Sequence, residues 1–242
     1  MQRYFLKSDE LILTDEDFHH AIKVMRLAVG DQVELVKQST EVVVAKMKQV
    51  TESSATFDYQ KTVETLVELP VEVTIASALS KKDKADWIVQ KGTEMGAAHF
   101  IFFNSDFSIA KWDQKKQAKK IERLQKIAKG AAEQAHRTKI PTISYAKKID
   151  EIFQQSYDIQ IVAYEESAKQ GEVSQLKKSF DLIEPNQNMI AVFGSEGGIS
   201  KSEIDKLATA GYQKVGLGPR ILRAETAPLY LLASLSFVSE LS

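Results

Sequence analysis

The sequence predicts an α/β protein of two domains: a small β-barrel over residues 1–70 and an α/β domain with a mostly parallel sheet over residues 71–242. Two observations carry this prediction. Up to Pro70, short runs rich in Val, Phe and Tyr alternate with turns rich in Ser and Thr, as in small barrels. Beyond Pro70, short apolar runs alternate with stretches of helical periodicity, which is typical of a parallel sheet covered by helices.

The first domain contains one predicted helix and several predicted strands. Thr14, with Asp17 three residues later, forms a capping-box pattern, and the apolar residues that follow share one helical face. Leu69-Pro70 is the expected domain boundary, because proline interrupts regular structure. The predicted strands are Gln32–Lys37, Glu41–Lys48 and Ala55–Gln60.

The second domain alternates strands and helices. A long helix is expected over Gln114–His136, another after a capping box at Ser200, and a last apolar helix over Ala227–Leu241 with Thr226 as its cap. A helix also ends at Gly96. The predicted strands are Val71–Leu79, Ala98–Phe103, Ile159–Tyr164, Met189–Phe193 and Lys214–Leu217.

Composition excludes several classes of protein. The chain has 242 residues, 32 basic and 33 acidic side chains, a net charge of −1 and no cysteine. Without cysteine there can be no disulfide scaffold, thiolate metal site or cysteine nucleophile. The sequence shows no apolar run long enough to span a membrane and no secretory signal, so we expect a cytoplasmic protein that does not enter a membrane.

The neutral total conceals one basic stretch. Residues 106–148 carry 12 basic and 4 acidic side chains, a local net charge of +8. A dense cluster of Lys and Arg is typical of phosphate binding. A solvated, lysine-rich helix face has the same pattern, so charge alone leaves both interpretations open.

Two glycine-containing loops follow predicted strands, at Phe193–Gly198 and at Leu217–Thr226. Ligands of open α/β sheets bind beyond the carboxyl ends of the strands, and glycine lets a backbone approach a ligand closely. Neither loop matches the P-loop or the dinucleotide fingerprint. Two tight turns that lead into helices without binding a ligand would have the same sequence pattern.

Together these loops resemble the paired signature of the RsmE-type 16S rRNA uridine-N3 methyltransferases of the SPOUT superfamily. The family usually has Pro where this chain has Ser195, and Thr where it has Ala224. Neither departure removes a glycine or a charge. Further matching segments lie along nearly the whole chain: Arg3-Tyr4-Phe5, His19-His20 through Arg26, Gly30-Asp31, Lys91–Gly96, and Glu133-Gln134 with Arg137 and Pro141.

The resemblance implies an N-terminal PUA-like barrel, a C-terminal SPOUT domain with a deep trefoil knot, and a homodimer. It implies S-adenosylmethionine as the cofactor, 16S rRNA of the small ribosomal subunit as the partner, and no metal. The expected cofactor-binding residues are Ala163, Tyr164, Glu165, Phe193, Gly194, Ser195, Glu196, Gly197, Gly198, Leu217, Gly218, Pro219, Ile221, Leu222 and Arg223.

Arg223 and Glu225 are the expected catalytic residues. Arg223 would stabilise negative charge on the uracil oxygens, and Glu225 would orient Arg223 or relay a proton. The alternative is that the two form a buried ion pair holding the last helix. Arg137 is expected either to bind phosphate or to pack at the dimer interface. The full set of expected RNA contacts is Arg3, Arg26, Lys111, Lys115, Lys116, Lys119, Lys120, Arg123 and Arg137.

Two other functions remain open. One is a different SPOUT RNA methyltransferase, acting on tRNA or on another rRNA base. The other is a non-catalytic RNA-binding or assembly factor that kept the fold, which the intact glycine loops and Arg223 disfavour. Binding of S-adenosylmethionine separates an enzyme from such a factor.

Overall fold

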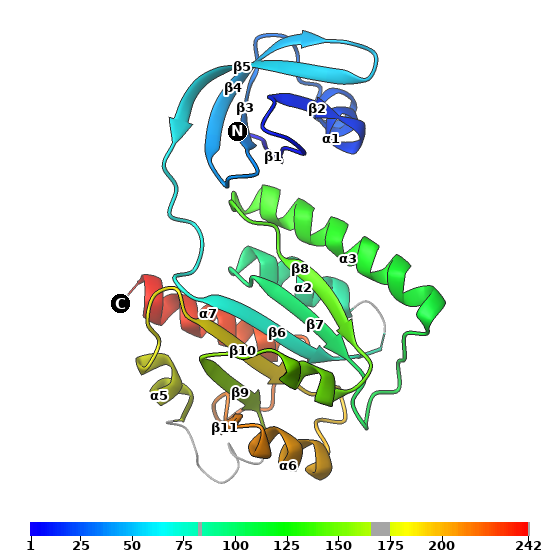
Figure 1. Cartoon of the computed structure of the whole chain (residues 1–242), viewed down its shortest axis with the longest axis vertical. Helices are drawn as coiled ribbons and strands as arrows, with labels where there is room; N and C mark the ends of the chain where they lie inside the picture. The colour runs from blue at the N-terminus through cyan, green and yellow to red at the C-terminus, as the bar shows by residue number, and fades with distance from the viewer. Residues whose placement is uncertain (82–83, 166–174, 242) are drawn as a thin grey trace. The chain divides into compact units, whose positions relative to one another are not determined.

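The computed structural model describes residues 1–81, 84–165 and 175–241, except for the side chains of residues 114 and 115 (Figure 1). The chain forms two compact units. The first is Met1–Glu68 with Ala132–Lys139, and the second is Leu69–Ala131 with Ile140–Ser242. The first unit therefore ends at Glu68 rather than at Pro70. It also takes in a segment from the middle of the chain, which sequence patterns did not indicate.

The first unit is built on a five-stranded sheet in the order β1-β3-β4-β5-β2. β1 runs parallel to β3, and the other pairs are antiparallel. The sheet is curled (Figure 1). The core of this unit includes Tyr4, Leu35, Val43 and Met47. The predicted small β domain is thus confirmed. Its strands are β1 (Arg3–Phe5), β2 (Ile12–Thr14), β3 (Gln32–Val36), β4 (Val42–Val50) and β5 (Ser54–Val63).

The helix of this unit begins differently from the prediction. α1 (Asp15–His19) leads directly into η1 (His20–Val24), a π-helical turn. The Thr14 hydroxyl donates to the Asp15 carboxylate at 3.0 Å and does not cap the helix. Asp15 has a left-handed φ of 52°, which departs from the helical start that a capping box needs. The predicted cap at Thr14 is therefore wrong.

The second unit contains a six-stranded sheet in the order β11-β9-β10-β6-β7-β8, and all its recorded pairs are parallel. The predicted parallel sheet is confirmed. β8 was not among the predicted strands. The strands are β6 (Glu72–Ala78), β7 (His99–Phe103), β8 (Thr142–Ala146), β9 (Ile159–Ala163), β10 (Asn188–Phe193) and β11 (Gln213–Val215).

Both faces of this sheet are covered, because neighbouring residues of β6 such as Ile75 and Ala76 point into different cores. One core contains residues of α2, α3, α5 and α7, and the other contains residues of η2 and α6. The bounds are α2 (Lys84–Glu94), α3 (Gln114–Gln134), η2 (Ile149–Gln154), α5 (Gln175–Asp181), α6 (Lys201–Thr209) and α7 (Ala227–Glu240).

The two predicted caps in this unit have opposite outcomes. At α6 the capping box forms: the Glu203 N–H donates to the Ser200 hydroxyl at 3.1 Å, and the Ser200 N–H donates to the Glu203 carboxylate at 2.9 Å. At α7, Thr226 makes no capping hydrogen bond with its side chain. None of the described helices combines the length and the apolar character that crossing a membrane requires.

Candidate active site

The site lies where four strands of the second unit end. The register pairs Phe193 of β10 with Ser77 of β6, and Val215 of β11 with Ala163 of β9. Because all these strands are parallel, the segments that follow them leave the sheet at the same edge. This is the edge at which open α/β sheets bind ligands.

A cavity of about 660 Å³ opens at this edge. Its volume falls in the range of small-molecule sites, roughly 300–1,000 Å³. All of the expected cofactor-binding residues except Pro219 line it. The structure therefore brings together three segments that lie far apart in sequence. It adds five lining residues that were not among the expected cofactor-binding residues: Lys84, Ile199, Arg220, Ala224 and Ala227.

The loop Gly194–Gly198 is a tight turn that requires its glycines. A Cβ atom on Gly194 would lie 2.6 Å from the carbonyl carbon of Gly198, which is closer than such atoms can approach. Gly198 itself has a left-handed φ of 80°. The Gly198 N–H donates to the Ser195 carbonyl at 2.9 Å and closes the turn. The turn therefore brings the backbones of Gly194 and Gly198 close together at this part of the wall.

Lys84, the first residue of α2, reaches into the cavity and pairs with two carboxylates. Its ammonium nitrogen lies 3.0 Å from Glu196 Oε1 and 2.9 Å from Glu225 Oε2. Sequence motifs did not single out Lys84. The available signal was its place after β6, whose end lies at the same sheet edge as the two glycine loops.

This triad perturbs the ionisation of its members. Burial opposes charge on Glu225, but the ammonium of Lys84 outweighs it and holds the pKa of that carboxyl below its usual range. The pKa of Glu196 is also lowered: burial raises it, but its own backbone N–H, the Lys84 ammonium and the backbone N–H of Lys81 together outweigh burial. Burial also works against charge on Lys84, yet its two carboxylate partners raise its pKa.

Arg223 lines the cavity and is exposed. The alternative of a buried ion pair between Arg223 and Glu225 does not match this arrangement, because the ion pair of Glu225 is made with Lys84. Arg223 acts on Glu225 through longer-range attraction, which further favours the ionised carboxylate. The guanidinium is therefore available to a ligand.

The expected RNA contacts divide into exposed and buried residues. Arg26 is exposed in the first unit. In the second unit, Lys120 lies 5.4 Å from the centre of the Trp112 ring, and Arg123 pairs with Asp86 at the surface. Lys115 belongs to α3, but its side chain lies outside the described residues. Exposed, and so able to reach a phosphate, are Lys111, Lys116, Lys119, Lys120 and Arg123.

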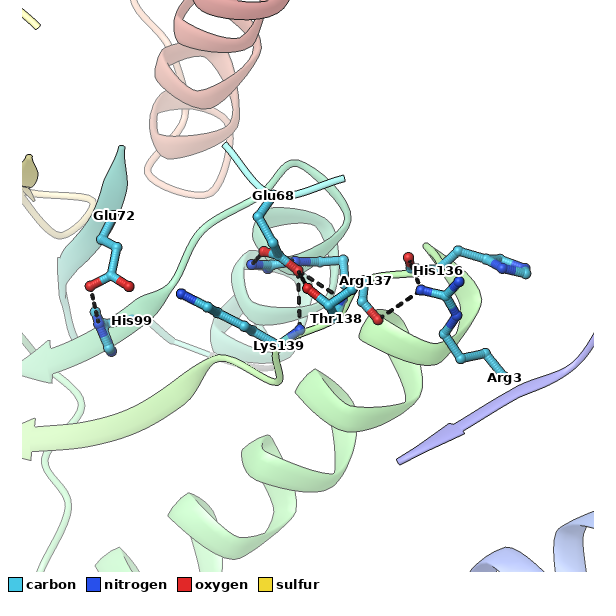
Figure 2. Close-up of polar contacts among 8 residues, drawn as sticks. All are labelled: Arg3, Glu68, Glu72, His99, His136, Arg137, Thr138 and Lys139. Atoms are coloured by element: carbon cyan, nitrogen blue, oxygen red, sulfur yellow. Dashed lines mark hydrogen bonds and ion pairs between the residues drawn. The ribbon is translucent and has the colours of Figure 1, made fainter. Parts of the chain in front are cut away.

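Two of the expected RNA contacts are buried in the first unit, and the prediction is wrong for both. Arg3 is 2% exposed, and its Nε donates to Glu34 at 2.9 Å. It also donates to the carbonyl oxygens of His136 and Arg137 (Figure 2). Arg137 is 2% exposed and pairs with Glu68. Neither guanidinium is accessible to a phosphate, since other parts of the unit already occupy its donors.

Two family models match parts of this chain. Residues 67–236 match a family model described as an RNA methyltransferase domain, and residues 13–58 match an RNA methyltransferase PUA domain. The ribosomal RNA small subunit methyltransferase E of Bacillus subtilis is 39% identical, over 100% of this chain and 98% of its own. The chain belongs to the ribosomal RNA small subunit methyltransferase E family. The Synechocystis protein of that name is 31% identical, over 94% of this chain and 73% of its own.

Solved structures share the fold of this chain. A crystal structure of a protein described as hypothetical has a TM-score of 0.90 at 36% identity and covers 99% of both chains. A small subunit methyltransferase E from Neisseria gonorrhoeae, solved bound to S-adenosyl methionine, has a TM-score of 0.85 at 24% identity and covers 98% of both chains. The latter likeness establishes the shared fold of this methyltransferase E chain and supports the predicted fold class.

The cavity of this methyltransferase E chain fits a nucleoside-like ligand with charged groups. Leu217, Leu222 and Ala227 supply apolar surface, and Glu196 and Arg223 supply charges of both signs. The Ser195 hydroxyl, in the same wall, is buried and has no hydrogen-bond partner among the described residues. Within the described part of the chain, no cluster of three or more His, Asp or Glu residues is arranged to hold a metal ion.

Proposed function

We propose that this protein transfers a methyl group from S-adenosylmethionine to N3 of a uridine in 16S rRNA of the small ribosomal subunit. The observation that carries the proposal is the cavity at the sheet edge, where the expected cofactor segments meet beside Arg223. Family membership supports RNA methylation. The N3 position comes from the resemblance of the two glycine loops to the uridine-N3 enzymes.

The cofactor would lie against Ala163–Glu165, Gly194–Gly198 and Leu217–Arg223. Backbone groups of the two glycine loops would hold adenine, ribose and the methionine moiety. When bound, S-adenosylmethionine supplies a methyl group already activated on a sulfonium. The task left to the protein is to position the base and to help remove its N3 proton.

The residues at the cavity have distinct roles in this reaction. N3 lies on the pairing edge of uracil, so the base must be unpaired or flipped out to reach it. Arg223, exposed in the cavity wall, stabilises negative charge that develops on the uracil oxygens as the N3 proton leaves. Glu225, held ionised, orients the guanidinium through attraction and can take part in a proton relay.

The RNA would follow the exposed cations already described. In the second unit these are the exposed Lys and Arg side chains at residues 111–123, and in the first unit Arg26. Arg26 has a left-handed φ of 56° and lies beside Met25 and Val29, which are 44% and 63% exposed. An exposed segment that combines an unusual backbone conformation with exposed apolar side chains is typical of a binding segment.

We also infer a homodimer and a knotted SPOUT domain, both of which the family resemblance implies, and a cytoplasmic location, as expected of a protein that acts on rRNA of the small ribosomal subunit. The homodimer is supported by α7, which buries Leu232 and Leu235 in the core but leaves Tyr230 38% and Phe237 62% exposed. A second copy of the chain would cover this apolar face. Light scattering of the purified protein tests the dimer, and a monomer of 27.1 kDa would contradict it.

The decisive experiment uses labelled S-adenosylmethionine and small ribosomal subunits from a strain that lacks the enzyme. We expect label in 3-methyluridine of 16S rRNA, and we expect Arg223→Ala to abolish transfer while the protein stays folded. Label in another nucleoside, or in tRNA alone, would show a different RNA methyltransferase. Failure of the wild-type protein to bind the cofactor at millimolar concentration would favour an assembly factor.

A further inference from the structure

Lys84 connects three separate parts of the second unit at the wall of the cavity. It starts α2, whereas Glu196 lies in the loop after β10 and Glu225 lies in the segment before α7. The ammonium contacts both carboxylates at 3.0 Å and 2.9 Å. The Lys84 side chain is 23% exposed and that of Glu225 is 19% exposed, so solvent screens this pair only partly.

Glu225 depends on this cation. Its Oε2 atom is buried and makes no well-formed hydrogen bond with the described residues, although the Lys84 ammonium lies beside it. The other charged groups that face it are Arg223, from its own segment, and Glu196, across the ammonium. A buried carboxylate left without a cation is costly and tends to become protonated.

We propose that Lys84 is a positioning residue for methyl transfer, which keeps Glu225 ionised and fixed at the cavity wall beside Arg223. The inference rests on the function proposed above, because it assigns Glu225 a role in that reaction. Lys84 itself need not touch the RNA base. Its two contacts join the loop after β10 to the segment that carries both Arg223 and Glu225.

Removal of the ammonium has a consequence of known sign. Burial raises the pKa of Glu225, and Lys84 is the largest opposing influence. Without Lys84, burial prevails and the carboxyl binds a proton at a higher pH. Glu225 would then lose its attraction for the Arg223 guanidinium under mildly acidic conditions, and activity would fall there first.

The test compares three variants of the full-length protein. Lys84→Met removes the ammonium, Lys84→Arg keeps a cation, and Lys91→Met is the matched control. Lys91 lies on the same helix and pairs with Glu94 at 2.8 Å, outside the cavity lining. Carbon-13 NMR of the glutamate carboxyls, assigned with Glu225→Gln, measures the titration of Glu225 in the free protein. Methyl-transfer rates across pH measure its consequence.

In Lys84→Met we expect the titration midpoint of Glu225 to rise by about one pH unit or more. We expect kcat relative to the wild type to fall by up to about tenfold as the pH is lowered through the new midpoint of Glu225, and to recover toward the wild-type value by about pH 8.5. The KM for S-adenosylmethionine should change less than about threefold, because the ammonium pairs with protein carboxylates. Lys84→Arg should restore most of the rate, and Lys91→Met should behave like the wild type.

Two results would overturn the inference. One is an unchanged Glu225 midpoint in Lys84→Met, and the other is a rate reduced by the same factor at every pH, which indicates a merely structural role. If Lys84→Met does not fold, Lys84→Gln carries the same expectations with a chain that can still hydrogen bond. If the wild-type protein does not methylate rRNA, the proposed function fails, whereas the NMR titration still decides how Lys84 acts on Glu225.

Discussion

Glu68 and Glu225 each pair with a cation, but their surroundings differ. Glu68, in the first unit, accepts hydrogen bonds from the Arg137 guanidinium, the Thr138 N–H at 2.8 Å, the Thr138 hydroxyl at 3.1 Å and the Lys139 N–H at 3.1 Å (Figure 2). Glu225, in the second unit, has the Lys84 ammonium at 2.9 Å, and its Oε2 makes no well-formed hydrogen bond with described residues.

The difference indicates how the two carboxylates are used. Both carboxylate oxygens of Glu68 already accept hydrogen bonds, so Glu68 can stabilise the fold but has little acceptor capacity left for a ligand. It joins the end of its segment to the residues that follow α3, within the same unit. Glu225 lies beside a cavity, where one flexible side chain and its own backbone N–H hold it, and this leaves it able to respond to a ligand.

The largest expected effect is on protein stability, and it follows from breaking the pair of Arg137 and Glu68. Arg137→Met leaves Glu68 without its guanidinium partner in a site where Arg137 is 2% exposed. Breaking a buried pair on one side costs about 3–5 kcal/mol, so the free energy of unfolding in urea should fall by that amount. Lys206→Met, which breaks a surface pair with Asp150, should cost less than about 1 kcal/mol. Equal costs in the two variants would contradict the comparison.

The next largest expected effect is on the rate of methyl transfer. Glu225→Gln keeps the shape of the side chain and removes its charge, so kcat should fall by about 100-fold or more. Stability should change by less than about 1 kcal/mol, because the pair with Lys84 is partly exposed. Methyl transfer and urea unfolding of the same preparation measure both quantities. Glu94→Gln, on the surface of α2, is the control, and a large stability loss with an intact rate in Glu225→Gln would reverse the assignment.

A smaller effect is expected at the glycine turn. In Gly194→Ala the new Cβ meets the backbone of Gly198 at 2.6 Å, so the turn must open. The affinity for S-adenosylmethionine, measured by isothermal titration calorimetry, should fall about tenfold, which corresponds to about 1.4 kcal/mol. Gly130→Ala in α3 is the matched control. Its Cβ meets no atom within 4 Å, so that variant should bind normally and be slightly more stable.

The smallest expected effect is on thermal stability at acidic pH. The pKa of Glu68 is lowered in the folded protein, because Arg137 and two backbone N–H groups outweigh burial. A lowered folded-state pKa stabilises the protein above the unfolded value of about 4.3, and this contribution disappears as pH falls through the folded value. The difference in Tm between the wild type and Glu68→Gln should therefore shrink between pH 7 and pH 3. A difference that stays constant over this range would contradict the role of this charge.

Local sequence patterns predicted local structure well where neighbours in sequence are also the interacting partners. The capping box at Ser200 formed, since both of its hydrogen bonds join residues three apart. The same kind of pattern at Thr14 did not form, because Asp15 has a left-handed backbone there. β8 was missed: it alternates exposed and buried residues at the sheet edge, so it lacks the continuous apolar run of the central strands.

From the sequence alone the small β domain and the parallel sheet could be predicted, because the periodicity of apolar residues encodes them, and the resemblance of the two glycine loops indicated segments that line the cavity. Only the tertiary structure decided which charges are available. Arg3 and Arg137 look like surface cations in sequence, but their carboxylate partners lie 31 and 69 residues away and bury them. No sequence pattern marked Lys84, which lies near Glu196 and Glu225 only because the ends of parallel strands meet at one edge of the sheet. Charge pairing depends on distance in space, which sequence spacing does not report.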